Sequence, residues 1–284
     1  MKRSFENKTC VITGAAGGIG RELALELARK GARLALSDVN SDALEKTQSD
    51  ARELGAEVHA TRLDVADHDS IYAYAEAVEA HFGEVHQLYN NAGVSGTGEL
   101  ADMSEELIQR VIDINLLGVL HGSRAFLPRL VKSGEGTLIN ISSLNGFAGM
   151  PGLPVYCATK FGVRGLTEAL RADALLRGDP VQIVCVHPGG IKTNIARANI
   201  GMLSELPPEI RELRSRQLDF YENKLLTYPA DKAARDIICG VARGKSRIVI
   251  TRQAKTLDWI ARLFPSGYLK ILNKHMQREL LADI

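Results

Sequence analysis

The stretch Lys-Thr-Cys-Val-Ile-Thr-Gly-Ala-Ala-Gly-Gly-Ile-Gly-Arg-Glu-Leu-Ala-Leu-Glu-Leu-Ala, residues 8–28, decides the fold. Residues 8–13 read as a short buried strand, and leucines and alanines at helical spacing follow from residue 21. The glycine-rich turn 14–20 lies between them. Such a turn lets the backbone approach a pyrophosphate, whose negative charge a helix N-terminus favours. The spacing is G-x-x-x-G-x-G rather than the commoner G-x-G-x-x-G, so an ordinary tight turn is the alternative.

A second strand, residues 32–37, ends at Asp38, which lies 20 residues beyond Gly18. A carboxylate at this distance and at a strand end can accept both ribose hydroxyls of an adenosine. It would repel a 2′-phosphate, and the glycine turn adds no basic residue to attract one. The sequence therefore predicts NAD as cofactor, with NADP less favoured. A helix N-cap or turn residue is the alternative role for Asp38.

Strands and helices alternate along the chain as far as residue 251. The predicted strands are 8–13, 32–37, 57–63, 87–89, 137–141, 181–186 and 247–251. This order predicts an α/β fold with a doubly wound parallel sheet of seven strands, a Rossmann fold in a single catalytic domain of residues 1–251. Within it, the weakly patterned stretch 194–228 is expected to form a substrate lid. Residues 252–284 form a helical C-terminal extension.

Polar residues follow two further predicted strands. Asp64-Val65 ends the third strand, where the carboxylate could meet an adenine amino group or else cap the next helix, predicted over 68–82. Asn90-Asn91-Ala92-Gly93 follows the fourth strand and predicts at least a tight turn. The carboxyl ends of parallel strands are where ligands bind in such sheets.

Asn115 interrupts the apolar side of a long helix predicted over 104–131. A buried asparagine must be hydrogen-bonded. It would either hold the helical ladder open or bind a water.

Tyr156 and Lys160 lie four residues apart in a helix that runs to about residue 176, shortly after Ser142-Ser143. Residues at this spacing share one helix face, and an ammonium one turn away favours a phenolate. A free tyrosine titrates near pKa ~10, so a decrease of about three units, roughly 4 kcal/mol, would suit it to proton exchange at neutral pH. Lys160 and a positive cofactor ring are the expected sources. A solvated helix face is the alternative explanation of this pair alone.

Composition indicates a globular protein of ordinary balance. The chain has 284 residues, 45% hydrophobic and 24% charged, with a formal net charge of +1, which gives no argument for nucleic-acid binding. Its four cysteines have no C-x-x-C spacing and predict neither a zinc site nor a redox motif. The chain has reduced thiols, no room for a signal peptide and no apolar run of bilayer length, which together predict a cytoplasmic protein. We also expect no metal site.

The ordered set of motifs resembles the short-chain dehydrogenase/reductase family in its compact single-domain form, over about residues 5–251. The motifs are Thr13-Gly14-x-x-x-Gly18-x-Gly20, Asn90-Asn91-Ala92-Gly93, Asn115, Ser143, Tyr156-x-x-x-Lys160 and Pro188-Gly189 with Thr193. His86 departs from the aspartate that the family often has there, and we expect it to be structural.

The resemblance implies a role for each matching residue. Tyr156 would be the proton donor and acceptor, Lys160 would bind the nicotinamide ribose and lower the pKa of Tyr156, and Ser143 rather than Ser142 would hold the substrate oxygen. Asn115 would anchor a water linking Lys160 to solvent, and Ile191 and Thr193 would contact the nicotinamide end. The implied cofactor-binding residues are Gly14, Gly17, Gly18, Ile19, Gly20, Asp38, Asp64, Val65, Asn91, Ala92, Gly93, Tyr156, Lys160, Pro188, Gly189, Ile191 and Thr193.

The segment after residue 251 has apolar residues at helical spacing on both sides of Pro265-Ser266-Gly267, and six Lys/Arg against one acid, Asp258, up to Arg278. Three roles remain open: packing on the body or a sister subunit, a flap over an apolar pocket, or a basic amphipathic membrane contact. The last two would suit a hydrophobic alcohol or ketone.

The function expected from these observations is an NAD-dependent oxidoreductase that interconverts an alcohol with a ketone or aldehyde. The resemblance implies a homodimer or homotetramer. Two rivals are a catalytically idle NAD(H)-sensing protein and a sugar-nucleotide epimerase or dehydratase. The first has no use for the full set of catalytic residues, and the second usually carries a larger C-terminal substrate domain.

Overall fold

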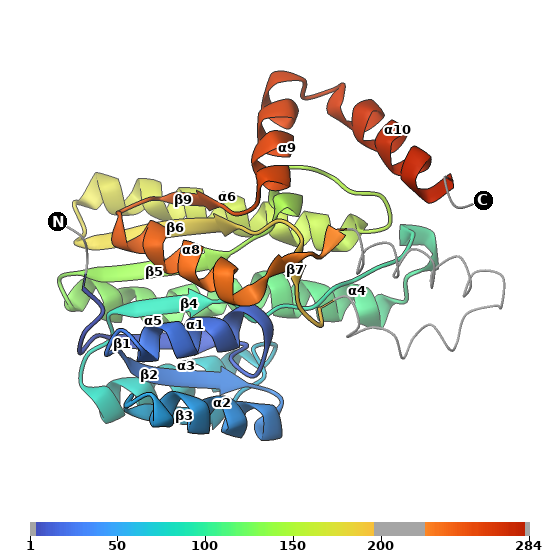
Figure 1. Cartoon of the computed structure of the whole chain (residues 1–284). Coiled ribbons are helices and arrows are strands. Elements are labelled where there is room, and N and C mark those ends of the chain that lie inside the picture. Colours follow the sequence, from blue (N-terminus) through green and yellow to red (C-terminus); the bar gives the residue numbers. More distant parts are fainter. Residues whose placement is uncertain (1–3, 196–224, 282–284) are drawn as a thin grey trace.

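The computed structural model describes residues 4–195 and 225–281. Its main sheet is parallel, with the strand order β3-β2-β1-β4-β5-β6-β9 (Figure 1). The strands are β1 (Thr9–Thr13), β2 (Arg33–Asp38), β3 (Val58–Arg62), β4 (Gln87–Asn90), β5 (Gly136–Ile141), β6 (Val181–His187) and β9 (Arg247–Val249). The predicted seven-stranded doubly wound fold is confirmed. The strand order reverses between β1 and β4, which makes the carboxyl ends of these two strands the expected ligand site.

Helices cover both faces of the sheet. In Figure 1, α1 and α8 lie in front of it, and α3 and α5 lie behind. The helices of the body are α1 (Gly18–Ala28), α2 (Ser41–Glu53), α3 (His68–Phe82), α4 (Glu105–Ile112), α5 (Gly118–Lys132), α6 (Pro154–Arg177) and α8 (Ala230–Ala242). Two short 3-10 turns, η1 (Leu100–Asp102) and η3 (Leu144–Gly146), complete the described body.

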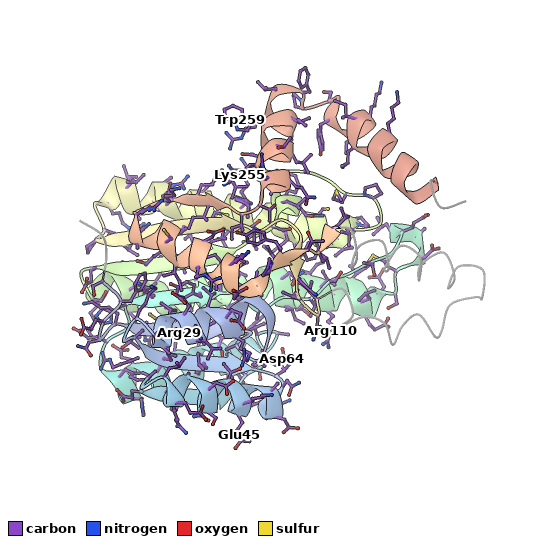
Figure 2. The ribbon with its side chains drawn as sticks, viewed as in Figure 1. Arg29, Glu45, Asp64, Arg110, Lys255 and Trp259 are labelled. Atoms are coloured by element: carbon purple, nitrogen blue, oxygen red, sulfur yellow. The ribbon has the colours of Figure 1, made fainter. Side chains whose placement is uncertain are left out.

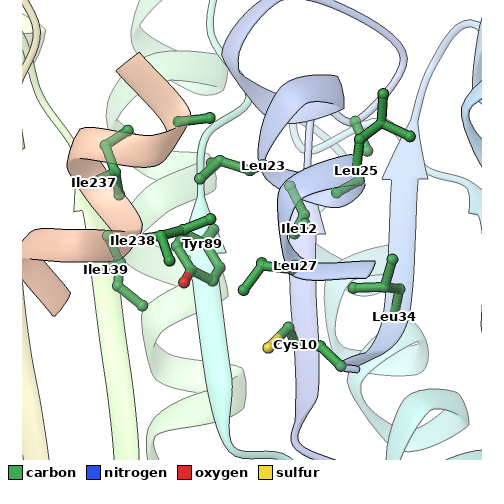
Figure 3. Close-up of a cluster of buried hydrophobic side chains, with 14 of the residues drawn as sticks. Cys10, Ile12, Leu23, Leu25, Leu27, Leu34, Tyr89, Ile139, Ile237 and Ile238 are labelled. Carbon is green, nitrogen blue, oxygen red and sulfur yellow. The ribbon is translucent and has the colours of Figure 1, made fainter. Parts of the chain in front are cut away.

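The sheet separates two hydrophobic cores, because side chains alternate across it. On β1, Cys10 and Ile12 face the core under α1 and α8, together with Leu23 and Leu27 (Figure 3). Val11 faces the other core, behind the sheet. Burial on both faces explains why the strands appear in the sequence as continuous apolar runs rather than as an alternating pattern.

The helix predicted over 104–131 is present, but it is not a regular α-helix throughout. A π-helical turn, η2 (Asp113–Leu117), separates α4 from α5 and contains Asn115. A π turn inserts one extra residue into the helix. Apolar periodicity alone does not show this insertion, because the pattern resumes after it.

A second, two-stranded sheet lies beside the main one. In it β7 (Ile191–Lys192) pairs in parallel with β8 (Tyr228–Pro229), which the sequence did not predict. The pair joins the two ends of the predicted lid, 194–228. Most of that lid lies outside the described residues.

The C-terminal extension forms two helices, α9 (Arg252–Leu263) and α10 (Tyr268–Leu281), as the sequence predicts. They rise from the body, and the turn between them lies far from the sheet (Figure 1). The predicted seventh strand, 247–251, ends two residues early, because Thr251 has a positive φ of 78° and its hydroxyl caps α9 by accepting from the Ala254 N–H at 3.2 Å. Among the described helices, none is long and apolar enough to cross a bilayer.

Candidate active site

The glycine turn after β1 and the loop after β4 are packed directly together. Gly14 has a φ of +67°, and a Cβ there would lie 2.8 Å from Cα of Ala92. A Cβ on Gly20 would lie 2.0 Å from the Gly14 carbonyl oxygen. The Thr13 hydroxyl accepts hydrogen bonds from the backbone N–H groups of Asn91 (3.0 Å) and Ala92 (3.1 Å). Neither glycine tolerates a side chain here, so this close approach explains two members of the motif.

The N-terminus of α1 is free to bind an anion. Gly17 at its N-cap supplies no side-chain hydrogen bond, whereas α2 and α3 are capped by the side chains of Asn40 and Asp67. A Cβ on Gly17 would meet no atom within 4 Å, so the space beside the turn is open. Uncapped N–H groups beside open space suit a pyrophosphate.

Asp38 lies beside the same turn. Its carboxylate accepts from the backbone N–H of Ala16 (3.0 Å) through one oxygen and from that of Asn40 (3.0 Å) through the other. The N-cap of α2 is Asn40, so the alternative that Asp38 caps this helix is wrong, although it does shape the turn. Each carboxylate oxygen keeps acceptor capacity for a ribose hydroxyl.

Asp64 follows the third strand, as predicted, but it does not cap the next helix. Its carboxylate accepts from the Ala66 N–H at 2.9 Å, while Asp67 caps α3 by accepting from the Ser70 N–H. The capping alternative for Asp64 is therefore wrong. Val65 packs against the start of α5, where a Cβ on Gly118 would lie 3.0 Å from the Val65 carbonyl oxygen.

Asn115 is fully buried and holds the loop after β4. Its amide accepts from the Val94 N–H and donates to the Val94 carbonyl oxygen, both at 2.8 Å. Its position in the π turn agrees with an opened helical ladder, while its side-chain amide is occupied by Val94. The contact also fixes Gly93, where a Cβ would lie 3.5 Å from Nζ of Lys160.

Ser143, Tyr156 and Lys160 lie together, carried by η3 and α6. Tyr156 is hydrogen-bonded to the side chain of Ser143, and Nζ of Lys160 lies 5.7 Å from the centre of the Tyr156 ring. Lys160 donates to the Ile141 carbonyl oxygen at 3.1 Å. The neighbouring Ser142 instead donates its hydroxyl to the Lys160 carbonyl oxygen at 2.8 Å, which supports the choice of Ser143 as the serine that faces the tyrosine.

The pKa of Tyr156 in the chain by itself lies above the ordinary value of a tyrosine. Burial raises this pKa to about 12, although the residue as a whole is only half-buried, and the hydrogen bond with Ser143 opposes the rise. Burial also lowers the pKa of Lys160 to about 8. The expected decrease in the pKa of Tyr156 depends on Lys160 together with a positive cofactor ring, and it stays a prediction.

Pro188, Gly189, Ile191 and Thr193 follow β6 along the same edge of the sheet. The Pro188 carbonyl oxygen accepts from the Leu144 N–H at 2.8 Å, and the Gly189 N–H donates to the Ile250 carbonyl oxygen at 3.1 Å. Ile191 is buried in the core beneath α1 and α8. A Cβ on Gly18 would lie 3.0 Å from the Thr193 methyl group, so Thr193 lies beside the glycine turn.

His187 is a buried residue of the site that the sequence analysis missed. Its Nδ1–H donates to the Ser143 carbonyl oxygen at 2.9 Å, and its ring packs edge-on against Phe147 with 5.3 Å between centroids. A histidine that ends a buried strand just before Pro188 was the available signal. His86, by contrast, is structural as expected, because its Nδ1 accepts from the Thr9 N–H at 3.2 Å.

A buried polar network beneath the site was also missed. The Asn90 amide donates to the Asn140 amide oxygen (2.8 Å) and the Ser123 hydroxyl (3.1 Å), and Asn140 donates to the Thr167 hydroxyl at 3.0 Å. These contacts tie β4, β5, α5 and α6 together. The signal was an asparagine in each of two adjacent buried strands. Within residues 4–195 and 225–281, no group of three potential metal ligands is present.

Comparison with known proteins agrees with this geometry. The sequence profile of the short chain dehydrogenase family matches residues 8–202, and the chain belongs to this family of oxidoreductases. It is 46% identical over 269 residues to a protein named oxidoreductase SadH from Mycobacterium tuberculosis (strain ATCC 25618 / H37Rv), covering 95% of both chains. It is 36% identical over 194 residues to the cyclohexanol dehydrogenase of Acinetobacter sp. (strain SE19), covering 68% of this chain and 76% of the relative.

A solved structure shares the fold over nearly the whole chain. The short chain dehydrogenase/reductase from Burkholderia phymatum, in complex with NAD, superposes with a TM-score of 0.82 at 30% sequence identity, covering 98% of this chain and 96% of the other. The likeness therefore includes most of the C-terminal extension.

Proposed function

We propose that this protein is an NAD-preferring oxidoreductase that interconverts a secondary alcohol and a ketone, or an alcohol and an aldehyde, with Tyr156 as general acid and base. One observation carries the proposal: the Tyr156 hydroxyl is hydrogen-bonded to Ser143 and shares its site with Lys160. This group lies at the carboxyl edge of the sheet, beside the loop packed on the glycine turn.

The residues of the chain divide the work. Bound nicotinamide supplies the hydride acceptor or donor. Ser143 donates a hydrogen bond to the substrate oxygen and orients it, and Tyr156 takes the hydroxyl proton during oxidation or returns it during reduction. The Lys160 ammonium stabilises the phenolate form of Tyr156 and so opposes the rise in the Tyr156 pKa that burial causes.

The cofactor preference rests on Asp38. Its carboxylate lies beside the uncapped turn before α1 and repels a second anion there. Gly14, Gly17, Gly18, Ile19 and Gly20 form the pyrophosphate cradle, while Asp64 and Val65 flank the adenine side. The NAD complex of the B. phymatum relative supports this assignment.

The loop between Ser143 and Tyr156 carries apolar side chains, which favours an apolar substrate. Phe147 and Ala148 form a hydrophobic cluster with Ala254 of α9, and Leu144, Leu257 and Tyr268 pack against it. The Gly149 N–H donates to the Tyr268 hydroxyl at 2.9 Å. The base of α9 and the start of α10 therefore pack on the loop between Ser143 and Tyr156, and these contacts give the loop an apolar lining. The cyclohexanol dehydrogenase relative supports a hydrophobic alcohol.

We also propose a homodimer or homotetramer joined through α5 and α6, in the cytoplasm. Phe161, Leu175 and Leu176 on α6 expose 42%, 76% and 88% of their surface in the single chain, which supports burial of this helix in an assembly. Molar mass measured by light scattering after gel filtration tests the assembly. A monomer would contradict it.

The deciding experiment is NAD-linked oxidation followed at the NADH absorbance, over alcohols from short secondary alcohols to bulky apolar ones, with NADP in parallel. We expect turnover with NAD and an apolar alcohol. Tyr156→Phe should lower kcat by about 10²–10⁴-fold, a typical contribution of acid–base catalysis, and leave NADH binding unchanged. A protein that binds NADH, turns over no alcohol and is unaffected by the variant would be the NAD(H) sensor instead. Conversion of a sugar nucleotide without net NADH formation would favour the epimerase.

A further inference from the structure

The turn between α9 and α10 gathers apolar side chains that the body leaves uncovered. Trp259, Leu263 and Phe264 expose 66%, 65% and 58% of their surface. Leu269 and Ile271, just beyond the turn, expose 43% and 55%. Apart from Phe161, Leu175 and Leu176 on α6, the large exposed hydrophobic side chains elsewhere on the described chain are scattered, so this concentration indicates an interaction surface.

Three of these residues form an apolar tip. Trp259 and Leu263 lie one helical turn apart on the same side of α9, and Phe264 follows at the end of the helix. We call Trp259, Leu263 and Phe264 the apolar tip. It lies at the far end of the arm that rises from the body (Figure 1).

Basic side chains lie along both helices of the arm. Lys255 lies one turn before Trp259 on the same side of α9 (Figure 2). The other exposed basic residues of the arm whose side chains the structure describes are Arg252, Arg262, Lys270 and Lys274. Between Arg252 and Lys274 the only acid is Asp258, which is buried and accepts from two nitrogens of Arg247 (both 2.8 Å) and from Arg262 (3.0 Å). Over residues 252–274, whose side chains the structure describes, the arm therefore presents positive charge without an exposed acid to balance it.

The charge selects one partner among those that could cover an apolar tip. A second copy of this chain meeting it through a two-fold contact would bring the same basic residues face to face, which is unfavourable. An anionic lipid surface complements both features, because it attracts the lysines and arginines and accepts tryptophan, leucine and phenylalanine at the headgroup level.

We propose that the α9–α10 arm is a reversible membrane anchor that inserts its apolar tip into an anionic lipid surface. The base of α9 is fixed by buried Ala254 and by the Asp258 ion pairs, so the tip can be immersed while the body keeps its structure. The proposal does not depend on the proposed activity.

Trp259 is the only tryptophan of the chain, so intrinsic fluorescence reports directly on the tip. The full-length protein is titrated with vesicles of phosphatidylcholine alone and with vesicles that also contain phosphatidylglycerol. We expect a shift of the emission to shorter wavelength with the anionic vesicles only, quenching by brominated acyl chains, and reversal by high salt.

Two double variants distinguish vesicle binding through the apolar tip from non-specific hydrophobic adsorption. Leu263→Ser with Phe264→Ser should weaken vesicle binding at least tenfold, because it removes two exposed side chains of the tip. Leu54→Ser with Leu100→Ser removes two exposed leucines of the body, at the end of α2 and in η1, and should leave binding unchanged. Binding that is the same on neutral vesicles, or a fluorescence shift that depends on protein concentration without lipid, would overturn the proposal and favour a second copy. No shift under any condition would also overturn it.

Discussion

Tyr156 and Lys160 illustrate how one cause moves two pKa values in opposite directions. Burial disfavours the charged form of each group, so it raises the pKa of the phenol to about 12 and lowers that of the ammonium to about 8. The sequence identifies both residues by their spacing. It does not show how deeply each is desolvated, because this depends on contacts with other elements, such as those of Lys160 with Gly93 and Ile141.

The oxidation rate is expected to rise with pH from neutrality upward. Removal of the alcohol proton requires the phenolate form of Tyr156, and the fraction of this form increases with pH as the phenol pKa in the ternary complex is approached. Lys160→Gln should move the rising limb to higher pH by removing the ammonium. The measurement is kcat against pH for oxidation at saturating NAD. A flat profile between pH 7 and pH 10 in both proteins would contradict this role.

Asp38→Asn should improve the use of NADP relative to NAD. The variant removes the charge that repels a 2′-phosphate, and its amide oxygen can still accept one of the two turn hydrogen bonds. We expect the ratio of kcat/KM for NADP to that for NAD to rise about tenfold or more. Asp42→Asn, an exposed acid in the first turn of α2, is the matched control and should leave the ratio unchanged. Equal ratios in all three proteins would mean that Asp38 does not contact the ribose.

At the scale of the element, the sequence predicts most of the fold. The buried parallel strands are short apolar runs. Helices such as α3 and α8 have the predicted bounds, because Asp67 and Pro229 mark clearly where their apolar periodicity begins. Two elements escaped prediction for the same physical reason. The π turn around Asn115 and the β7–β8 pair depend on tertiary contacts rather than on any local pattern.

The candidate site divides in the same way. Gly14, Ser143, Tyr156 and Lys160 belong to local motifs, and the structure brings them to one edge of the sheet. His187 was missed because its partner, the Ser143 carbonyl, lies 44 residues earlier in the chain. The network from Asn90 to Thr167 was missed for the same reason.

Tyr268→Phe tests the contact between the extension and the substrate-side loop. The variant keeps the ring in its cluster and removes the acceptor of the Gly149 N–H. A hydrogen bond of about 1 kcal/mol predicts an increase of about fivefold in KM for bulky apolar alcohols. The kcat for a short alcohol should change little. A uniform loss with all substrates would instead indicate general destabilisation, which a thermal melt would detect.

At the scale of the whole molecule, buried His187 makes stability depend on pH. Burial lowers its pKa from 6.5 to about 4, against the opposing effect of its hydrogen bond to Ser143. The unfolded chain therefore binds more protons between pH 6.5 and pH 4, so stability is greatest above pH 6.5 and declines as the pH falls through this window. The full contribution is about 3 kcal/mol.

His187→Asn should remove this part of the acid sensitivity, because its amide can still donate to the Ser143 carbonyl but takes up no proton. The measurement is the free energy of unfolding from urea titrations at pH 7, 5.5 and 4.5. The wild-type protein should lose more stability than the variant over this series. Parallel losses in the two proteins would show that His187 is not the group that titrates.

The loop Asn91–Val94 has a consequence for the order of events during turnover. Thr13 holds one end of this loop against the glycine turn, and Asn115 holds the other end beside Lys160. A ligand bound at the glycine turn would therefore also stabilise the position of the Lys160 ammonium, although Lys160 lies more than 60 residues beyond this loop in the sequence. We expect a compulsory order in which the dinucleotide binds before the alcohol. The reason is that Lys160, and with it Tyr156, is held in position only once the loop has been stabilised. Product-inhibition patterns would show whether the two substrates bind in this order.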